Sequence, residues 1–201
     1  MTSIAKLFHV SALRLFLLAL IGGGTLLAAE ARAAGATFGD KPTFQSADNF
    51  TYQLSDDKQA FTMVFNPAFE ATVANAPTGK DPGGPIATKI LSLVIPVYGK
   101  KIKTTFIVSA SVTADEGAGG AIMLSVNDKQ TVTRFGATGE KEMLVQLNYA
   151  SDSANDVRLT VLLLAEHDSA HPKAAALVHV TAIDSDLAAM NKRRAGAKGK
   201  K

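Results

Sequence analysis

The chain has 201 residues, with 21 Lys and Arg, 18 Asp and Glu, no cysteine and no tryptophan. The lack of cysteine excludes disulfide bonds, a thiol nucleophile and cysteine-bearing zinc sites, so an apolar core must hold the fold alone. Once residues 1–33 are set aside as an export signal, the remaining length is typical of one domain.

Residues 1–33 have the pattern of a signal peptide. Lys6 and Arg14 precede the apolar run 15–29, and alanines at 29, 31 and 33 offer small-x-small cleavage sites. An uncleaved anchor is the alternative, but the run is short for a membrane span. The pattern therefore predicts a bacterial periplasmic or secreted protein that is not transmembrane after signal cleavage.

Residues 34–47 are predicted to be a lead-in arm, because Gly39 and Pro42 interrupt a stretch with few aliphatic residues. Alternating apolar residues then predict a hairpin of strands 50–54 and 61–65 around the turn 55–58. Pro67 cannot donate to a central ladder, so a separate short strand is expected over 69–73. The Pro- and Gly-rich stretch 75–85 predicts a surface loop.

The stretch 90–112 is predicted to form a long β-hairpin whose polar tip is 98–101. Residues 102–112 alternate between core-like and mostly polar or small side chains. Residues 90–97 are apolar on both faces, which is typical of a central strand covered on both sides. We expect this hairpin to be the centre of the fold.

Turn signals separate the later apolar runs. Strands are expected at 122–126, 131–135, 143–149, 157–165 and 174–183, with a helix as the alternative for the alanine-rich last run. Together the runs predict an all-β fold, an antiparallel β-sandwich or jelly roll of roughly nine or ten strands. We place this domain at residues 48–187.

Residues 188–201 are predicted to be a disordered basic tail. Its six basic residues are Lys192, Arg193, Arg194, Lys198, Lys200 and Lys201. Residues 35–190 hold 12 Lys and Arg against 17 Asp and Glu, so the basic character belongs to the tail. The tail is the candidate contact for anionic surfaces, with a purely solubilising role as the alternative, and no specific nucleic-acid partner is indicated.

The loop EHDSAHP holds the densest group of metal-type ligands, His167, Asp168 and His171. Imidazole nitrogens and carboxylate oxygens ligate zinc and related ions. Pro172 argues against a helix that would bring both histidines onto one face, so a solvated polar turn is the alternative. His179 follows on the next strand, where a histidine between valines ordinarily faces the polar side.

Acidic loops offer hard oxygen ligands for a Ca²⁺ cofactor. These residues are Asp115, Glu116, Asp152, Asn155, Asp156, Asp184 and Asp186. None follows the spacing of a calcium-loop motif, so we expect exposed turn carboxylates and no cofactor, with a Ca²⁺ site as the alternative. A hydrolase would need a carboxylate pair chosen from Asp152, Asp156, Glu166 and Asp168.

The expected hairpin tip joins an aromatic ring to positive charge. Tyr98, Lys100, Lys101 and Lys103 are candidates for binding an anionic glycan or another envelope component, and a solvent-exposed turn is the alternative. No nucleophile elbow, phosphate loop or zinc-protease motif occurs in the sequence. The chain therefore carries no catalytic residues that sequence alone can identify.

The stretch LSDDKQAFTMVFNPAFEATV followed by ILSLVIPV resembles secreted β-sandwich proteins of unknown function. The similarity covers at most a third of the chain, and the cysteines common in such proteins are missing here. The resemblance implies a secreted β-sandwich and no activity.

These patterns predict an exported, non-enzymatic β-sandwich protein of the bacterial envelope. We expect a binding or adhesion module whose tail contacts anionic surfaces, with a glycan or protein as its partner. The first alternative is a structural subunit that joins an envelope assembly through edge-strand pairing. The second is a hydrolase that uses loop carboxylates.

Overall fold

The computed structural model describes residues 36–44, 50–73, 85–99, 101–152 and 156–186. The predicted signal peptide and basic tail lie outside these ranges. Within them the chain forms twelve β-strands and no helix, so none of the described residues lies in a helix long and apolar enough to cross a membrane.

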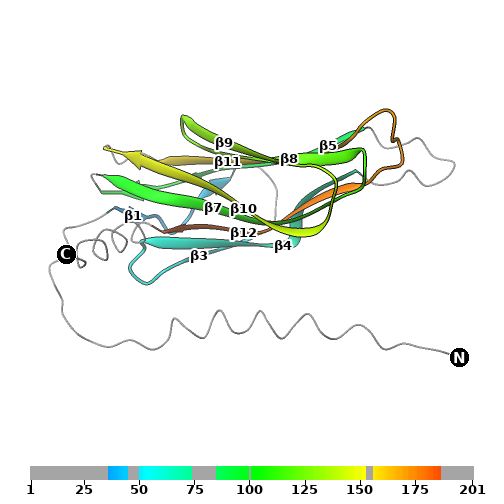
Figure 1. The fold of residues 1–201 in the computed structure, drawn as a ribbon. Helices are drawn as coiled ribbons and strands as arrows, with labels where there is room; N and C mark the ends of the chain where they lie inside the picture. Colours follow the sequence, from blue (N-terminus) through cyan, green and yellow to red (C-terminus); the bar gives the residue numbers. More distant parts are fainter. Residues whose placement is uncertain (1–35, 45–49, 74–84, 100, 153–155, 187–201) are drawn as a thin grey trace, which may run out of the picture. The chain divides into compact units, whose positions relative to one another are not determined.

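Ten of the strands form two five-stranded antiparallel sheets (Figure 1). The first sheet has the order β10, β7, β12, β4, β3, with bounds Thr138–Ser151, Ile102–Ala114, Ala176–Asp186, Ala60–Val73 and Phe50–Leu54. The second has the order β2, β5, β11, β8, β9, with bounds Thr43–Phe44, Ile86–Ile95, Val157–His167, Ala118–Val126 and Lys129–Phe135. The short strands β1 (Thr37–Phe38) and β6 (Val97–Tyr98) pair with each other. The predicted all-β sandwich is confirmed.

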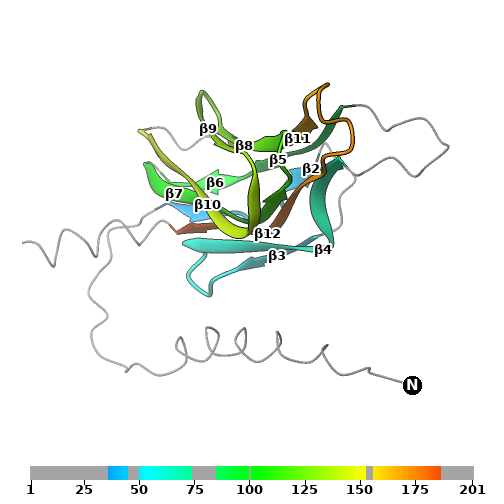
Figure 2. The ribbon, with the colours of Figure 1, turned by 45° about the vertical axis from the view of Figure 1, so that its right-hand side comes forward.

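Alternating side chains build the core between the two layers. Along β7 every second residue from Ile102 to Ala114 is buried, and along β11 the same holds from Val157 to Ala165. The two sheets stack these faces against each other, as the ribbon seen from a second angle shows (Figure 2). Two buried hydroxyls, Thr104 and Ser185, share a hydrogen bond of 2.7 Å between their oxygens across β7 and β12.

The predicted central hairpin is wrong. β5 pairs with β11 and β2, whereas β7 pairs with β10 and β12 in the other sheet. β5 and β7 therefore belong to different sheets, and the short strand β6, which follows β5, pairs with β1. Both apolar runs bury one face in the shared core, and that burial satisfies their hydrophobic pattern without pairing them to each other.

The predicted hairpin of 50–54 with 61–65 is confirmed as the pairing of β3 with β4. The expected break at Pro67 is wrong, because β4 continues to Val73 as one strand. The register between β4 and β12 shifts at this point, so that the four residues 65–68 lie opposite the single residue Thr181. Proline is tolerated in such a β-bulge.

The last run forms a strand rather than a helix, and β12 lies in the middle of the first sheet. Residues of the lead-in arm also enter the fold, since β2 pairs with β5 and Phe38 is fully buried against Phe61 at a ring-centroid distance of 5.0 Å.

Candidate functional site

The length of β11 separates two ends of the sandwich. Asp156 precedes the strand and Asp168 follows it, so these residues lie at opposite ends of a strand about 33 Å long. We call the end with the 115–117 turn and the 168–174 loop the loop end, and the other the tip end. In Figure 1 the orange 168–174 loop marks the loop end.

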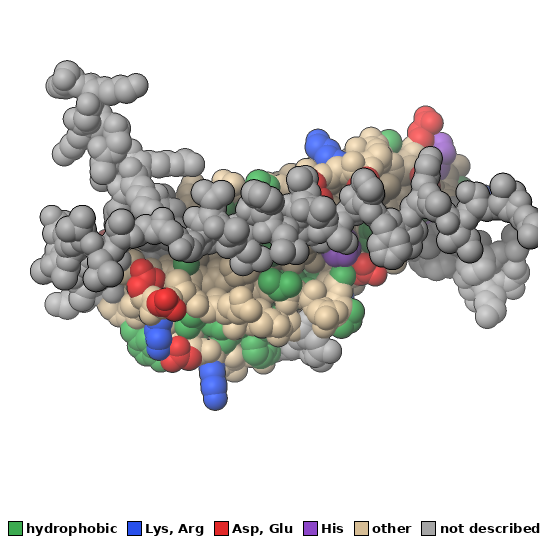
Figure 3. Space-filling view, turned by 90° about the horizontal axis from the view of Figure 1, so that it is seen from below, with side chains coloured by type: hydrophobic (Ala, Val, Ile, Leu, Met, Phe, Trp, Pro, Cys, Tyr) green, Lys and Arg blue, Asp and Glu red, His purple; other side chains and the backbone are tan. Residues whose placement is uncertain are grey.

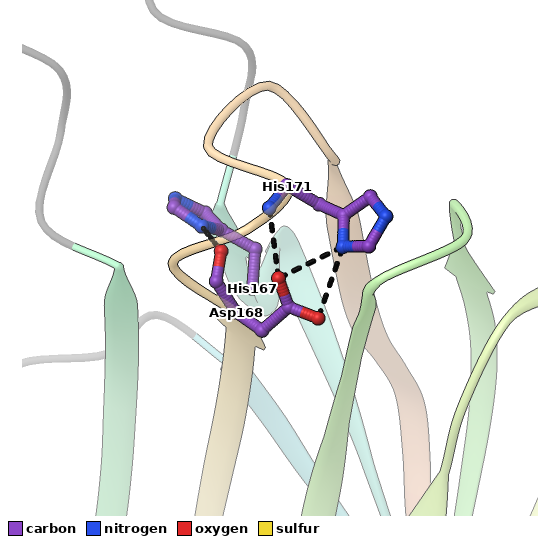
Figure 4. Close-up of polar contacts among 3 residues, drawn as sticks. All are labelled: His167, Asp168 and His171. Carbon is purple, nitrogen blue, oxygen red and sulfur yellow. Dashed lines mark hydrogen bonds and ion pairs between the residues drawn. The ribbon is translucent and has the colours of Figure 1, made fainter.

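Asp168 organises the loop that joins β11 to β12. Its Oδ1 accepts a hydrogen bond from the His171 backbone N–H at 2.8 Å, and the His171 Nδ1 lies 2.8 Å and 3.0 Å from its two carboxylate oxygens. The hydrogen bond from the His171 side chain lowers the pKa of Asp168 below its ordinary value. Figure 4 shows the His171 ring facing this carboxylate.

The 115–117 turn of the neighbouring connection holds the same loop in place. Gly117 has a left-handed φ of 79°, and a Cβ there would overlap the His171 ring. The Asp168 N–H donates to the Gly117 carbonyl at 2.9 Å, and Asp115 Oδ2 accepts from the Ala175 N–H at 2.8 Å. The two connections therefore form one hydrogen-bonded unit.

Two open depressions lie beside this unit. The first, which we call the loop-end depression, has a volume of about 350 Å³. It is lined by Gly117, Ala118, Gly119, Phe135, Gly136, Glu166, His167 and Asp168. The second, of about 420 Å³, is lined by Asp115, Glu116 and residues 170–174. Both volumes are within the size range of small-ligand sites.

The predicted metal ligands are neighbours that point in different directions. The His167 ring lies on the opposite side of the loop from the His171 ring, and its Nδ1 is 3.0 Å from the Asp168 backbone oxygen (Figure 4). Among the residues that the structure describes, no three His, Asp or Glu side chains form a group that could hold a metal ion. Metal binding by His167, Asp168 and His171 stays a prediction.

The candidate carboxylates are divided between the two ends. Asp115, Glu116, Glu166 and Asp168 lie at the loop end, while Asp152 and Asp156 lie at the tip end. A hydrolytic pair taken from both ends is therefore too far apart to act on one bond. Asp184 is on the outer face of the first sheet, where it accepts a hydrogen bond from Thr62 Oγ1 at 2.7 Å. Asn155 and the Asp186 side chain lie outside the described part of the chain, and a Ca²⁺ site stays a prediction.

The residues of the predicted hairpin tip are spread over different strand pairs. Tyr98 is 63% exposed and stands opposite Thr37, whereas Lys103 lies on β7 opposite Ala150. Lys101 forms an exposed ion pair with Asp152, with 3.5 Å between Nζ and Oδ1. Lys100 and the six basic tail residues lie outside the described ranges. Ligand binding by this group stays a prediction.

The outer face of the first sheet is rich in hydroxyl and amide side chains. His179 lies there 3.9 Å from Glu70, between Nδ1 and Oε2, so it faces the polar side as expected. Among the coloured atoms in Figure 3, tan predominates, with scattered hydrophobic and charged side chains.

Sequence reasoning missed Phe135 and the glycines at 117 and 119. The Phe135 ring lies over Gly120, where a Cβ would overlap it, and the Phe135 carbonyl would be overlapped by a Cβ at Gly119. The signal in the sequence was the glycine-rich stretch 115–120, DEGAGG, which predicts a turn but not the residues that pack onto it. In the structure the turn gives way to β8 at Ala118. The contact between β8 and β9 becomes visible only with the strand register.

Comparisons with known proteins give weak structural similarity only. No protein-family model and no curated protein sequence matches this chain. The CBM36-1 domain of a multidomain xylanase from the hindgut metagenome of Trinervitermes trinervoides aligns with a TM-score of 0.32 and 8% identity, covering 75% of this chain and 94% of that one. A family 29 carbohydrate-binding module from Piromyces equi gives 0.23 and 10%, covering 76% and 92%.

Dimeric latent PorU from Porphyromonas gingivalis gives a TM-score of 0.31 and 14% identity, covering 71% of this chain and 14% of that one. The chain thus has a weak similarity to carbohydrate-binding β-sandwich modules among other proteins. At these scores no function is carried over from them to this chain.

Proposed function

We propose that this protein is an exported, non-enzymatic binding module of the bacterial envelope, and that its loop end binds a hydroxyl-bearing ligand such as the end of a glycan chain. The observation that carries the proposal is the loop-end depression, where two carboxylates, an imidazole and an aromatic ring surround glycines. Such a mixture of a few polar groups with an apolar surface is typical of small-ligand sites.

The polar groups of the depression suit hydroxyl ligands. The carboxylate oxygens of Glu166 and Asp168 accept hydrogen bonds, so they favour a ligand that donates. The His167 Nδ1 lies 3.0 Å from a carbonyl oxygen, which only accepts hydrogen bonds, so this contact requires a proton on Nδ1. In the tautomer that has its proton on Nδ1, Nε2 is an acceptor. A sugar hydroxyl can donate to each of these groups.

The floor and one wall of the depression suit the apolar face of a sugar ring. Gly117 and Gly119 line the depression with backbone atoms alone. The space where their Cβ atoms would stand is taken by the His171 ring and the Phe135 carbonyl. Phe135 is partly buried at the end of the core and supplies an aromatic surface.

The hydrogen bonds within the loop support tight binding by fixing the site before the ligand arrives. Asp168 is held by His171 and by Gly117, so its carboxylate loses little freedom on binding. The basic tail would add salt-sensitive contact with anionic surfaces, independently of this site.

The test is a binding screen of the protein against immobilised neutral and acidic oligosaccharides and isolated envelope fractions. We expect at least one glycan to bind, and His167→Ala to weaken that binding about tenfold or more, because the substitution removes one polar wall of the depression.

His179→Ala is the matched control, since it removes a histidine from the outer face of the first sheet. It is expected to leave glycan affinity unchanged. Equal affinity of both variants, or no binding to any member of the panel, would contradict the proposed site.

A further inference from the structure

An apolar row crosses the outer face of the second sheet. Ile90 pairs with Leu162, Leu162 with Met123, and Met123 with Val132, so four strands place these side chains side by side. All four point away from the core. Ile90 and Val132 are 50% and 49% exposed, and the two between them are partly exposed.

The first sheet has no equivalent row among its described residues. Its outer apolar residues Val64 and Leu144 share a row, but Ala182 and Ser109 stand between them. An uninterrupted exposed row of large apolar side chains on one sheet alone marks that face as an interaction surface.

Two opposite charges flank the apolar row, and their arrangement suits a second copy of the same chain. On β11, Arg158 lies four residues before Leu162 and Glu166 lies four residues after it. Both therefore share the outer face of the strand with Leu162. A two-fold axis along the apolar row would place each Arg158 opposite the Glu166 of a second copy. Because the operation is symmetric, both charge pairs form at once.

The remaining positions agree with the same axis. Val94 would meet Ile86 of the other copy, so both outer ends of β5 contact apolar partners. Arg134 would meet Gln130, and no two like charges oppose each other on the face. A two-fold axis parallel to the strands would instead place β11 of one copy against β8 of the other. Arg158 and Glu166 would then lie opposite no residue of opposite charge.

We propose that the protein forms a homodimer by packing the outer faces of two second sheets against each other. Four strands and five rows give a contact of about 500 Å² per copy at ordinary strand spacing. A total near 1,000 Å² is at the lower limit for specific interfaces, so the dimer is concentration-dependent. Stacked sheets at about 10 Å separation allow the rows to interdigitate.

The test is sedimentation analysis of the protein over a range of concentrations. We expect the mass to rise from monomer to dimer between about 10 μM and 1 mM. Ile90→Lys and Val132→Lys should each weaken association about tenfold or more, because each puts two unpaired lysines into the contact. Val64→Lys is the matched control, with a similar 45% exposure on the first sheet, and should have no effect.

Charge reversal tests the axis itself. Arg158→Glu and Glu166→Arg should each weaken association, since each opposes like charges twice, while the double variant restores it. Glu166 also lines the loop-end depression, so Glu166→Arg alters both sites. His167→Ala should leave association unchanged and Arg158→Glu should leave glycan affinity unchanged, which separates this inference from ligand binding at the loop end.

A monomer at all concentrations would overturn the proposal. So would association that survives Ile90→Lys and Val132→Lys, which would favour pairing through the edge strands β10 or β3. Failure of the double charge reversal to restore association would overturn the proposed axis. Unchanged circular dichroism and unfolding midpoints are required of every variant.

Discussion

Asp168 shows how one exposed side chain fixes the candidate site. Its carboxylate contacts both the backbone and the ring of His171, and these contacts lower its pKa. The sequence identified Asp168 and His171 as neighbours in a polar loop. It could not show that the His171 ring packs on Gly117, because that glycine is far away along the chain and belongs to a different connection.

The lowered pKa of Asp168 predicts a pH dependence of stability. A carboxylate whose folded pKa is below its unfolded value near 3.9 contributes stability that is present above about pH 4. The contribution is lost as the pH falls through the folded pKa. Asp168→Asn should therefore lower the unfolding midpoint at neutral pH, and the difference from wild type should shrink below about pH 4.

The measurement is thermal or urea unfolding of both proteins across that pH range. His171→Ala provides the control background, because Asp168→Asn should have a smaller effect once its partner ring is absent. A difference between wild type and Asp168→Asn that stays constant down to pH 2 would show that the contact with His171 does not depend on the carboxylate charge.

At the scale of elements, the β8–β9 turn joins the two sheets through Asn127. Its backbone has a left-handed φ of 52°, which Asn tolerates better than most residues. Its Oδ1 accepts from the Arg158 N–H at 2.8 Å, and its Nδ2 donates to the Tyr149 hydroxyl at 2.6 Å. The turn is thereby tied to β11 in its own sheet and to β10 in the other.

Substitution of Asn127 should separate the backbone contribution from the side-chain contribution. Asn127→Gly keeps the left-handed turn but loses both side-chain bonds, so we expect a loss of about 1–3 kcal/mol in unfolding free energy. Asn127→Ala should cost more, by up to about 1 kcal/mol, because the turn is also strained. Tyr149→Phe removes only one bond and should cost less than either. Equal stability of the Gly and Ala variants in urea unfolding would contradict this account.

Element types were predictable from the sequence, but pairings were predictable only where the turn was short. The β3–β4 hairpin follows from its turn residues and is confirmed. For β8 and β9 the sequence predicted two strands with a turn signal between them, and the register shows that they pair. The connection around Tyr98 has the same polar appearance, yet it crosses from one sheet to the other. Alternation of apolar and polar residues indicates that a strand has one buried face. It does not indicate to which sheet the strand belongs.

At the scale of the whole molecule, the fold class followed from the sequence because period-two patterning recurs along the chain. The surfaces did not follow from it. The apolar row of the second sheet draws one residue from each of four strands, and Ile90 and Val132 are 42 positions apart, so their adjacency depends on three strand registers. The loop-end depression has the same origin, since it joins residues from three connections.

The charge balance of the whole chain predicts that the tail, and not the sandwich, contacts anionic surfaces. Residues 191–201 carry six positive charges, while residues 35–190 have an excess of five negative ones. We expect the protein to bind anionic lipid vesicles at low salt and to be released as screening shortens the range of attraction. Deletion of 191–201 should abolish this binding in vesicle co-sedimentation and leave glycan affinity and the unfolding midpoint unchanged.

A tail of equal length with its six basic residues replaced by glutamine is the control, because it should behave like the deletion if charge is the cause. Vesicle binding that survives either change would mean that the acidic sandwich itself holds an anion-binding surface.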